Sequence, residues 1–281
     1  MNVAIIQQRL NTYQCKTPLD EENAIKEITQ EVALMALARA NFFRVAAFHG
    51  GTALRILYGL QRFSEDLDFA LQQPNEHFKW SQYFDTIDNE LKNYGYQAEF
   101  QDRSNADQNI KKAFLKDNSI GKVLILHYPN AFHHMKKIRI KLEIDINPPS
   151  GAQSELRYLD YPLPFSVRAQ TLPSSFSGKI HALLCRNYMK GRDWYDFIWY
   201  VAMKTDINYP LLSSALYQTG SWARQSLEIN KPWILSALEQ KILAIDWQQA
   251  VQDVSRFLKP NEQKSLELWH QDFFMSLLQK L

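Results

Sequence analysis

Two kinds of periodicity run along the first half of the chain. Apolar residues recur at three- and four-residue spacing over residues 21–48, which predicts one long helix or two shorter ones. A glycine pair follows, and the apolar run at 53–60 predicts a short helix that begins at this glycine-rich turn. The segments 64–71 and 138–146 instead alternate apolar and polar residues, which is typical of strands with one polar face.

The second half lacks the alternation of the first. Prolines gather in residues 147–173, which we interpret as a linker. Further elements of the first half are a helix at 76–91 and strands at 94–100 and 123–128. Beyond the linker we expect helices only, at 179–189, 193–204, 211–228, 232–243, 247–258 and 261–281. These patterns predict an α/β (α+β) core with a mixed sheet over residues 1–165 and a helical domain over residues 166–281.

Composition narrows the class of protein. The 281 residues are 46% hydrophobic and 22% charged, as in globular proteins, and the formal net charge is only +2, so any nucleic-acid affinity must come from a local patch. The two cysteines stand outside any Cys/His run, which argues against a zinc site or a disulfide framework. The most apolar stretch, 32–48, contains Arg39 and Arg44, so we expect no membrane span. The predicted location is the cytoplasm.

Carboxylates at strand spacing suggest a metal site. Asp66 and Asp68 are two residues apart on a predicted strand, so both leave the same face about 7 Å apart at the backbone. Glu143 and Asp145 repeat this spacing on a second strand. If the two strands pair, three or four carboxylates converge, and their repulsion calls for a cation. We therefore predict Mg²⁺ or Mn²⁺ at this site, although an isolated carboxylate pair of this kind is more often simply solvated.

The glycine pair suggests a second ligand. The backbone amides of Gly50 and Gly51, the hydroxyl of Thr52 and the start of the helix that follows would form an anion-binding nest. A phosphate group beside a divalent metal indicates nucleotide chemistry. In two-metal phosphoryl transfer one ion activates the attacking hydroxyl, and the other stabilises the leaving pyrophosphate.

These residues carry a family resemblance. The run FHGGTALRILYGLQRFSEDLDFAL, residues 48–71, resembles the first motif of the polymerase-beta-like nucleotidyltransferases, in particular the AbiEii/AbiGii-type toxins, with the pattern GGT-x-LR followed by R-[FST]-x-DLDF. The matching residues are Gly50, Gly51, Thr52, Leu54, Arg55, Arg62, Asp66, Leu67, Asp68 and Phe69. The segment IKLEIDI, residues 140–146, is similar to the strand that supplies the third carboxylate. The resemblance favours Glu143 for that role, with Asp145 second.

A downstream segment extends the resemblance. The run KIHALLCRNYMKGRDWYDFIWY, residues 179–200, is similar to the family pattern K-x-x-A-L-x-x-R…R-D-x-Y-D-L. The matching residues are Lys179, Arg186, Arg192, Asp193 and Asp196, with Phe197 where leucine is usual. The resemblance implies that Lys179 contacts the triphosphate and that Asp193 completes the active-site cleft from the helical domain.

The family implies transfer of a nucleotidyl group from a nucleoside triphosphate (NTP) to an acceptor hydroxyl. Its members act as toxins in type IV-like toxin–antitoxin and phage abortive-infection pairs, opposed by a separately encoded antitoxin, and some modify the 3′ end of tRNA. RNA is therefore the expected acceptor, and the basic run at 133–141 could guide its backbone, although a solvated strand edge explains that run equally well. The alternatives are nucleotidylation of a protein or a small molecule, or a non-catalytic nucleotide-binding protein.

Several of these residues also have structural interpretations. Arg55 and Arg62 flank the acidic strand and could bind phosphate or hold a carboxylate, and for Arg55 the structural role is the better interpretation. Asp193 could cap a helix, and Arg192 could pair with Asp196. Trp194, Trp199 and Tyr200 stand at helical spacing and are expected in a core rather than on a base-stacking surface.

Overall fold

The computed structural model describes residues 3–102, 119–128 and 136–281. The chain divides into two compact units. The first, here called the α/β unit, comprises Met1–Gly59, Phe63–Pro148 and Glu155–Ala169. The second, here called the helical unit, comprises Leu60–Arg62, Pro149–Ser154 and Gln170–Leu281. Two short segments that precede residue 166 thus belong to the helical unit.

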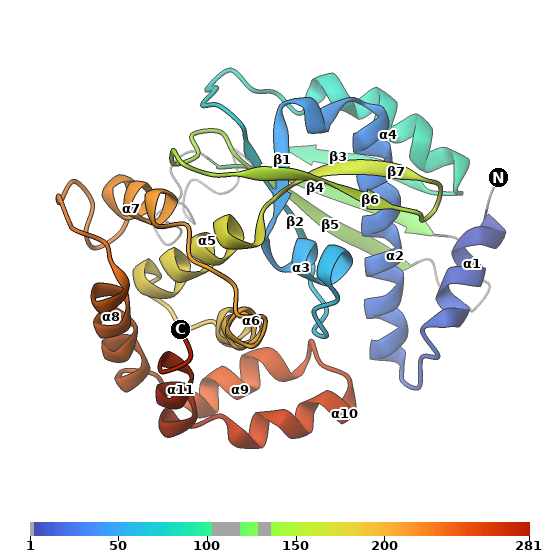
Figure 1. Cartoon of the computed structure of the whole chain (residues 1–281). Helices are drawn as coiled ribbons and strands as arrows, with labels where there is room; N and C mark the ends of the chain where they lie inside the picture. The colour runs from blue at the N-terminus through green and yellow to red at the C-terminus, as the bar shows by residue number, and fades with distance from the viewer. Residues whose placement is uncertain (1–2, 103–118, 129–135) are drawn as a thin grey trace. The chain divides into compact units, whose positions relative to one another are not determined.

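Except for the end residues Ser154 and Gln170, which belong to the helical unit, the strands of the described residues lie in the α/β unit. Its elements in chain order are α1 (Val3–Thr12), α2 (Pro18–Arg39), a 3₁₀ turn (Phe42–Arg44), β1 (Ala46–His49), α3 (Gly50–Tyr58), β2 (Asp66–Leu71), α4 (Ser81–Asn93), β3 (Gln97–Asp102), β4 (Ser119–Tyr128), β5 (Lys136–Asp145), β6 (Ser154–Leu159) and β7 (Phe165–Gln170). The strands form one seven-stranded sheet in the order β3-β4-β5-β2-β1-β7-β6 (Figure 1). Pairing is parallel between β2 and β5 and between β1 and β7, and antiparallel for β1–β2, β3–β4 and β4–β5. The predicted α/β fold with a mixed sheet is confirmed.

Helix α2 is the longest helix of this unit and is largely buried. It begins at a capping box in which the Thr17 side chain accepts from the Asp20 amide, while Asp20 accepts from the Thr17 amide. Most of its central turns are buried, and Figure 1 shows it running across the sheet. An aromatic cluster closes one part of this core, where the Phe42 ring stacks on Trp80 at 5.2 Å and meets Phe69 edge-on at 4.8 Å.

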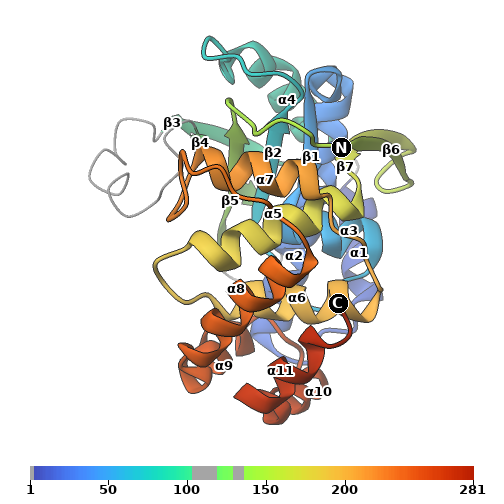
Figure 2. The same ribbon diagram turned by 60° about the vertical axis from the view of Figure 1, so that its left-hand side comes forward.

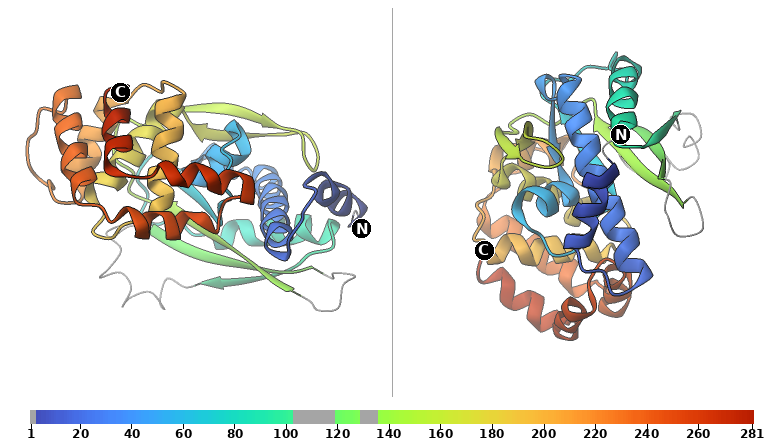
Figure 3. Two further views of the ribbon diagram at one scale, coloured as in Figure 1. Left: turned by 90° about the horizontal axis from the view of Figure 1, so that it is seen from below. Right: turned by 90° about the vertical axis from the view of Figure 1, so that its right-hand side faces the viewer.

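The structure of this unit differs from the sequence predictions mainly in three places. The helix predicted to reach residue 48 ends at Arg39, and β1 occupies the four residues before Gly50. A four-residue apolar run has too little length to separate strand from helix by periodicity. The predicted linker at 147–173 contains β6 and β7. Strand β6 buries little apolar surface, so its sequence lacks the pattern of a core strand. Helix α1 was not predicted. Figure 3 shows β4 and β5 as a long antiparallel pair.

The helical unit has a core of its own. Its elements are α5 (Leu172–Cys185), α6 (Gly191–Ala202), α7 (Tyr209–Gln218), α8 (Lys231–Leu243), α9 (Trp247–Ser255), α10 (Pro260–Gln263), a second 3₁₀ turn (Lys264–Leu268) and α11 (Gln271–Leu278). Helices α5 and α6 lie side by side (Figure 2), and Phe176 of α5 stacks on Tyr200 of α6 at 4.6 Å. Trp194 and Tyr200 are buried, as expected of core residues, whereas Trp199 is only partly buried.

Two predicted helices of this unit are shorter than expected. The helix predicted over 211–228 ends at Gln218, and the one predicted over 261–281 is divided into α10, the second 3₁₀ turn and α11. In the described part of the chain, none of the helices has the length and apolar character that crossing a membrane requires.

Candidate active site

Strand pairing brings the predicted carboxylates together. In the parallel pair β2–β5, Asp68 lies opposite Glu143 and Asp66 lies opposite Lys141. Paired residues on neighbouring strands point to the same face, and neighbouring strands are about 4.8 Å apart. Asp66, Asp68 and Glu143 therefore share one face of the sheet, as the sequence predicted on the condition that these strands pair.

The start of α3 meets the carboxylate of Asp68. Strand β1 is antiparallel to β2, with His49 opposite Asp68, and α3 begins at the next residue, Gly50. Gly50 has a φ of +81°, and a Cβ atom at this position would collide with Asp68 Oδ2 and lie 3.1 Å from its Cγ. Only glycine fits both the backbone conformation and this close approach. The first turn of α3, with the buried Gly51, thus presents backbone amides beside a carboxylate, at the helix end that also attracts anions.

Thr52 holds this turn against the acidic strand. Its side chain is fully buried, and its hydroxyl donates a hydrogen bond to the backbone carbonyl of Asp66. Because a buried carbonyl without a partner is costly, this bond fixes the start of β2 relative to α3. The role that the structure shows for the Thr52 hydroxyl is therefore to position Asp66.

Arg55 and Asp145 have structural partners of their own. The Nε of Arg55 donates to Glu27 Oε2 of α2 at 2.7 Å, and its guanidinium lies 4.4 Å from the centre of the Phe63 ring. This favours the structural interpretation of Arg55. Asp145 lies opposite Ala70, two residue pairs beyond Asp68 and Glu143, and its Oδ1 accepts from the Asn147 amide at 3.0 Å.

The sequence analysis missed a cation within the carboxylate group. Lys141 forms an ion pair with Glu143 on the same strand, and both side chains are about one third exposed. Partial burial alone would lower the pKa of Lys141, but Glu143, and then Asp66 and Asp68, raise it above its usual value. The alternation of β5 already placed Lys141 on the acidic face. Its positive charge suggested an RNA contact instead.

The donor set of this face fits a divalent metal ion. Carboxylate oxygens are the ligands that Mg²⁺ and Mn²⁺ prefer. The carboxylate of Asp68 lies close to Gly50, the first residue of α3. Within the described ranges no three His, Cys, Asp or Glu side chains already form a ready ligand group. In this arrangement the Glu143 carboxylate is paired with the ammonium group of Lys141.

The downstream motif forms a separate, buried cluster in the helical unit. Lys179 Nζ lies 2.6 Å from Asp193 Oδ1 and 2.8 Å from Asp196 Oδ2, and Arg186 also pairs with Asp193. Arg62 donates two bonds to Asp196, of 2.6 and 2.7 Å. Although burial alone would raise the pKa values of the two aspartates, Lys179 with Arg186 lowers that of Asp193, and Arg62 with Lys179 lowers that of Asp196.

One ion pair in this region differs from the prediction. Asp196 is paired with Arg62 and Lys179, so the suggested Arg192–Asp196 pair is wrong. Arg192 instead has its Nε 4.0 Å from Asp253 Oδ2 of α9. Arg192 and Asp196 are four residues apart on α6, a spacing at which side chains can form an ion pair. The buried guanidinium of Arg62 instead bonds to both oxygens of Asp196, in the forked geometry that arginine favours.

Comparisons with known proteins place this geometry in a family. A family model described as "Nucleotidyl transferase AbiEii toxin, Type IV TA system" matches residues 32–275, which is most of the chain and includes both clusters. The chain belongs to the AbiEii nucleotidyltransferase toxin family. It is therefore a nucleotidyltransferase, and the family is that of toxins in type IV toxin–antitoxin systems. No curated protein matches the chain.

Two solved structures share the fold of this chain. JHP933 of Helicobacter pylori is 17% identical with a TM-score of 0.54, over 92% of this chain and 91% of that one. A proposed nucleotidyltransferase of the same organism is 16% identical with a TM-score of 0.52, over 97% and 94%. At these identities the similarity concerns the fold.

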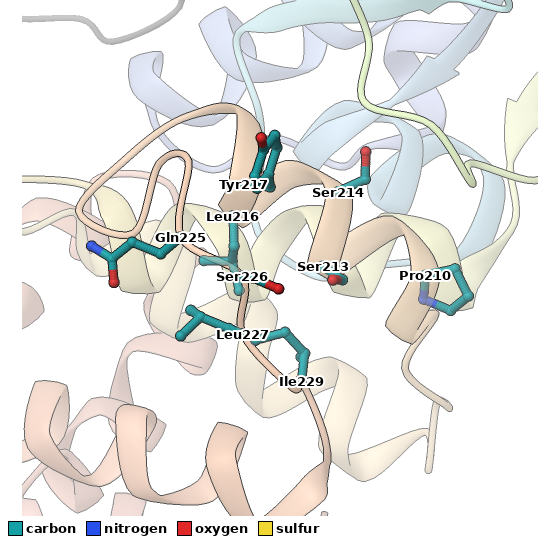
Figure 4. A pocket seen from close by; sticks show the side chains of 9 residues that line it. All are labelled: Pro210, Ser213, Ser214, Leu216, Tyr217, Gln225, Ser226, Leu227 and Ile229. Atoms are coloured by element: carbon teal, nitrogen blue, oxygen red, sulfur yellow. The ribbon is translucent and has the colours of Figure 1, made fainter.

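The helical unit also has a pocket that the predicted site residues do not line. It has a volume of about 350 Å³ and lies in the helical unit between α7 and the segment before α8 (Figure 4). Tyr217, Ser226 and Ile229 are among its lining residues, and none of the predicted site residues contributes to it.

Proposed function

We propose that this AbiEii-family protein holds Mg²⁺ or Mn²⁺ with Asp66, Asp68 and Glu143 and transfers a nucleotidyl group from an NTP to the 3′ hydroxyl of an RNA, in particular tRNA. The single observation that carries the proposal is the register of β2 and β5, which sets Asp68 directly opposite Glu143 beside the first turn of α3. Carboxylates for a metal and amides for a phosphate thus lie next to each other.

Glu143 is proposed as the third carboxylate in preference to Asp145. Glu143 faces Asp68 across the strand pair, whereas Asp145 faces an alanine and accepts a hydrogen bond from the backbone at the end of β5. Residues two apart on a strand are separated by about 7 Å. Asp145 is therefore displaced from the metal site by two residue pairs and serves to end the strand.

The chain's own groups define the reaction that this site supports. The amides of Gly50 and Gly51 would bind phosphate oxygens of the NTP, and Asp66, Asp68 and Glu143 would hold the divalent ion. When bound, the ion would supply charge neutralisation at the phosphates and a more acidic acceptor hydroxyl. In the transfer that this arrangement supports, the acceptor hydroxyl loses its proton to solvent, its oxygen bonds to the α-phosphorus, the bond to the bridging oxygen breaks, and pyrophosphate leaves with the electron pair of that bond.

Lys179 and Asp193 are proposed as further residues on which the reaction depends. Lys179 would neutralise charge on the triphosphate, as the family resemblance implies, and Asp193 holds its ammonium group at 2.6 Å. The proposal of an RNA acceptor is supported by the basic residues of β5 that precede Glu143, of which Arg139 is exposed. His133 and His134 of the basic run lie outside the described residues.

The experiment that tests the function is a labelling reaction. Purified protein is incubated with Mg²⁺ and each α-³²P-labelled NTP in turn, with total RNA or total protein as acceptor. We expect label in a tRNA-sized band for one or more nucleotides. Asp68→Asn and Glu143→Gln should abolish labelling. Asp145→Asn is the matched control, because its amide oxygen still accepts the bond from Asn147, and it should remain active.

Each acceptor gives a distinct outcome. Label on protein, lost in Asp68→Asn, would replace RNA by a protein acceptor and leave the chemistry in place. Label on neither acceptor would contradict the RNA proposal, and a reaction with aminoglycoside-like small molecules would then be tested. The proposed cellular role, that of a toxin opposed by an antitoxin in phage defence, predicts growth arrest on expression of the wild type and none with Asp68→Asn.

A further inference from the structure

A lysine stands within the proposed metal site. Lys141 lies opposite Asp66 in the β2–β5 register and forms its ion pair with Glu143. We infer that Lys141 competes with the divalent ion for Glu143, and thereby sets how tightly and how many divalent ions the site holds before the nucleotide binds. This inference rests on the proposed function of the three carboxylates.

Charge balance on this face shows what the lysine does. Three carboxylates, Asp66, Asp68 and Glu143, give a formal charge of −3, and Lys141 reduces it to −2. One divalent ion then neutralises the group, whereas a second ion would have to enter a site that is already neutral. Like charges a few ångströms apart repel strongly in a partly buried site. The second ion should therefore arrive with the triphosphate, which supplies its own negative charge.

The lysine has a second partner once Glu143 binds the ion. Its four-carbon stem is flexible, and its side chain is partly exposed, so its ammonium group can turn from Glu143 to another anion nearby. The anion expected beside this carboxylate group is the triphosphate of the NTP. Lys141 thus acts as a positioning residue for Glu143 and then as a contact for phosphate, a role that a neutral side chain could not fill.

Direct Mn²⁺ binding tests this inference. Free Mn²⁺ is measured by its EPR signal during titration of the wild type, Lys141→Gln and Arg139→Gln without nucleotide. Arg139 is the matched control, because it lies two residues earlier on the same face of β5 and its removal takes away the same charge. We expect about tenfold tighter Mn²⁺ binding in Lys141→Gln and less than about a twofold change in Arg139→Gln. Damage to the fold would weaken binding, so a gain is specific.

The outcomes separate the inference from the proposed function. If the wild type binds Mn²⁺, Asp68→Asn abolishes that binding and Lys141→Gln binds no more tightly than the wild type, then the inference is wrong and the metal site stands. If neither the wild type nor Lys141→Gln binds Mn²⁺, both the metal site and the inference are wrong. Binding by Lys141→Gln alone would support the competition in its strongest form.

Discussion

The buried ion pair between Arg62 and Asp196 gives a sharp stability prediction. The two side chains are 4% and 0% exposed and are joined by bonds of 2.6 and 2.7 Å, and Asp196 also holds Lys179 at 2.8 Å. Removing one member of a buried pair leaves the other charge without compensation, which costs about 3–5 kcal/mol. Because Asp196→Asn would leave two cations short of one carboxylate, we expect a loss in the upper part of this range.

Urea denaturation followed by circular dichroism measures the loss. Asp196→Asn should lower the free energy of unfolding of the helical unit by about 4 kcal/mol and its melting temperature by about 10 °C or more. The matched control is Arg39→Met, which breaks the more exposed pair between Arg39 and Glu90, and should cost no more than about 1 kcal/mol.

A double variant checks the reasoning. Arg62→Met combined with Asp196→Leu removes both charges and fills the site with apolar atoms, so it should be more stable than Asp196→Asn alone. A loss below about 1 kcal/mol for Asp196→Asn, equal to that of the exposed control, would refute the argument that burial makes this pair structurally essential.

Three further predictions concern the α/β unit. Gly50→Ala should abolish nucleotidyl transfer, because the added Cβ displaces Asp68. Its control is Gly59→Ala, at a position with a φ of +77° and open space around it. This control should lower the free energy of unfolding by about 1 kcal/mol and keep activity in the labelling assay. Thr52→Val should lower both activity and the urea midpoint, and Thr52→Ser should restore both. Burial raises the pKa of Glu31 to about 7, so the folded protein favours the protonated side chain. Relative to Glu31→Gln, the wild type should therefore lose about 3 kcal/mol of stability as the pH rises from 4.5 through 7. A stability difference that does not change with pH would contradict this prediction.

Sequence patterns predicted β2 and β5, the strands of the candidate site, because each has one polar face. Strands β2 and β5 alternate cleanly, so alternation alone assigns each strand's carboxylates to one face. Strand β1 is a short apolar run, and β6 carries exposed Leu156 and Tyr158 at positions where a core-facing strand would be buried, so neither showed a clear pattern. Proline content then led to the wrong prediction of a linker.

Contacts between residues that are far apart in the chain could not be predicted from the sequence. Alternation shows that Asp68 and Glu143 each lie on a polar face, but only the register shows that they oppose each other and that Asp145 does not. The pair of Arg62 with Asp196 spans 134 positions, which no local pattern could indicate. Lys141 was assigned to the basic run by its charge, and only its pairing with Glu143 reveals its place in the site.

The central claim is that the carboxylates of β2 and β5 transfer a nucleotidyl group. The most direct test uses an NTP labelled at the α-phosphate in parallel with one labelled at the γ-phosphate, with Mg²⁺, total RNA, and the wild type or Asp68→Asn. The account predicts that α-label enters RNA, that γ-label leaves as pyrophosphate in equal amount, and that Asp68→Asn does neither. Transfer of γ-label, or undiminished α-label transfer by Asp68→Asn, would contradict it.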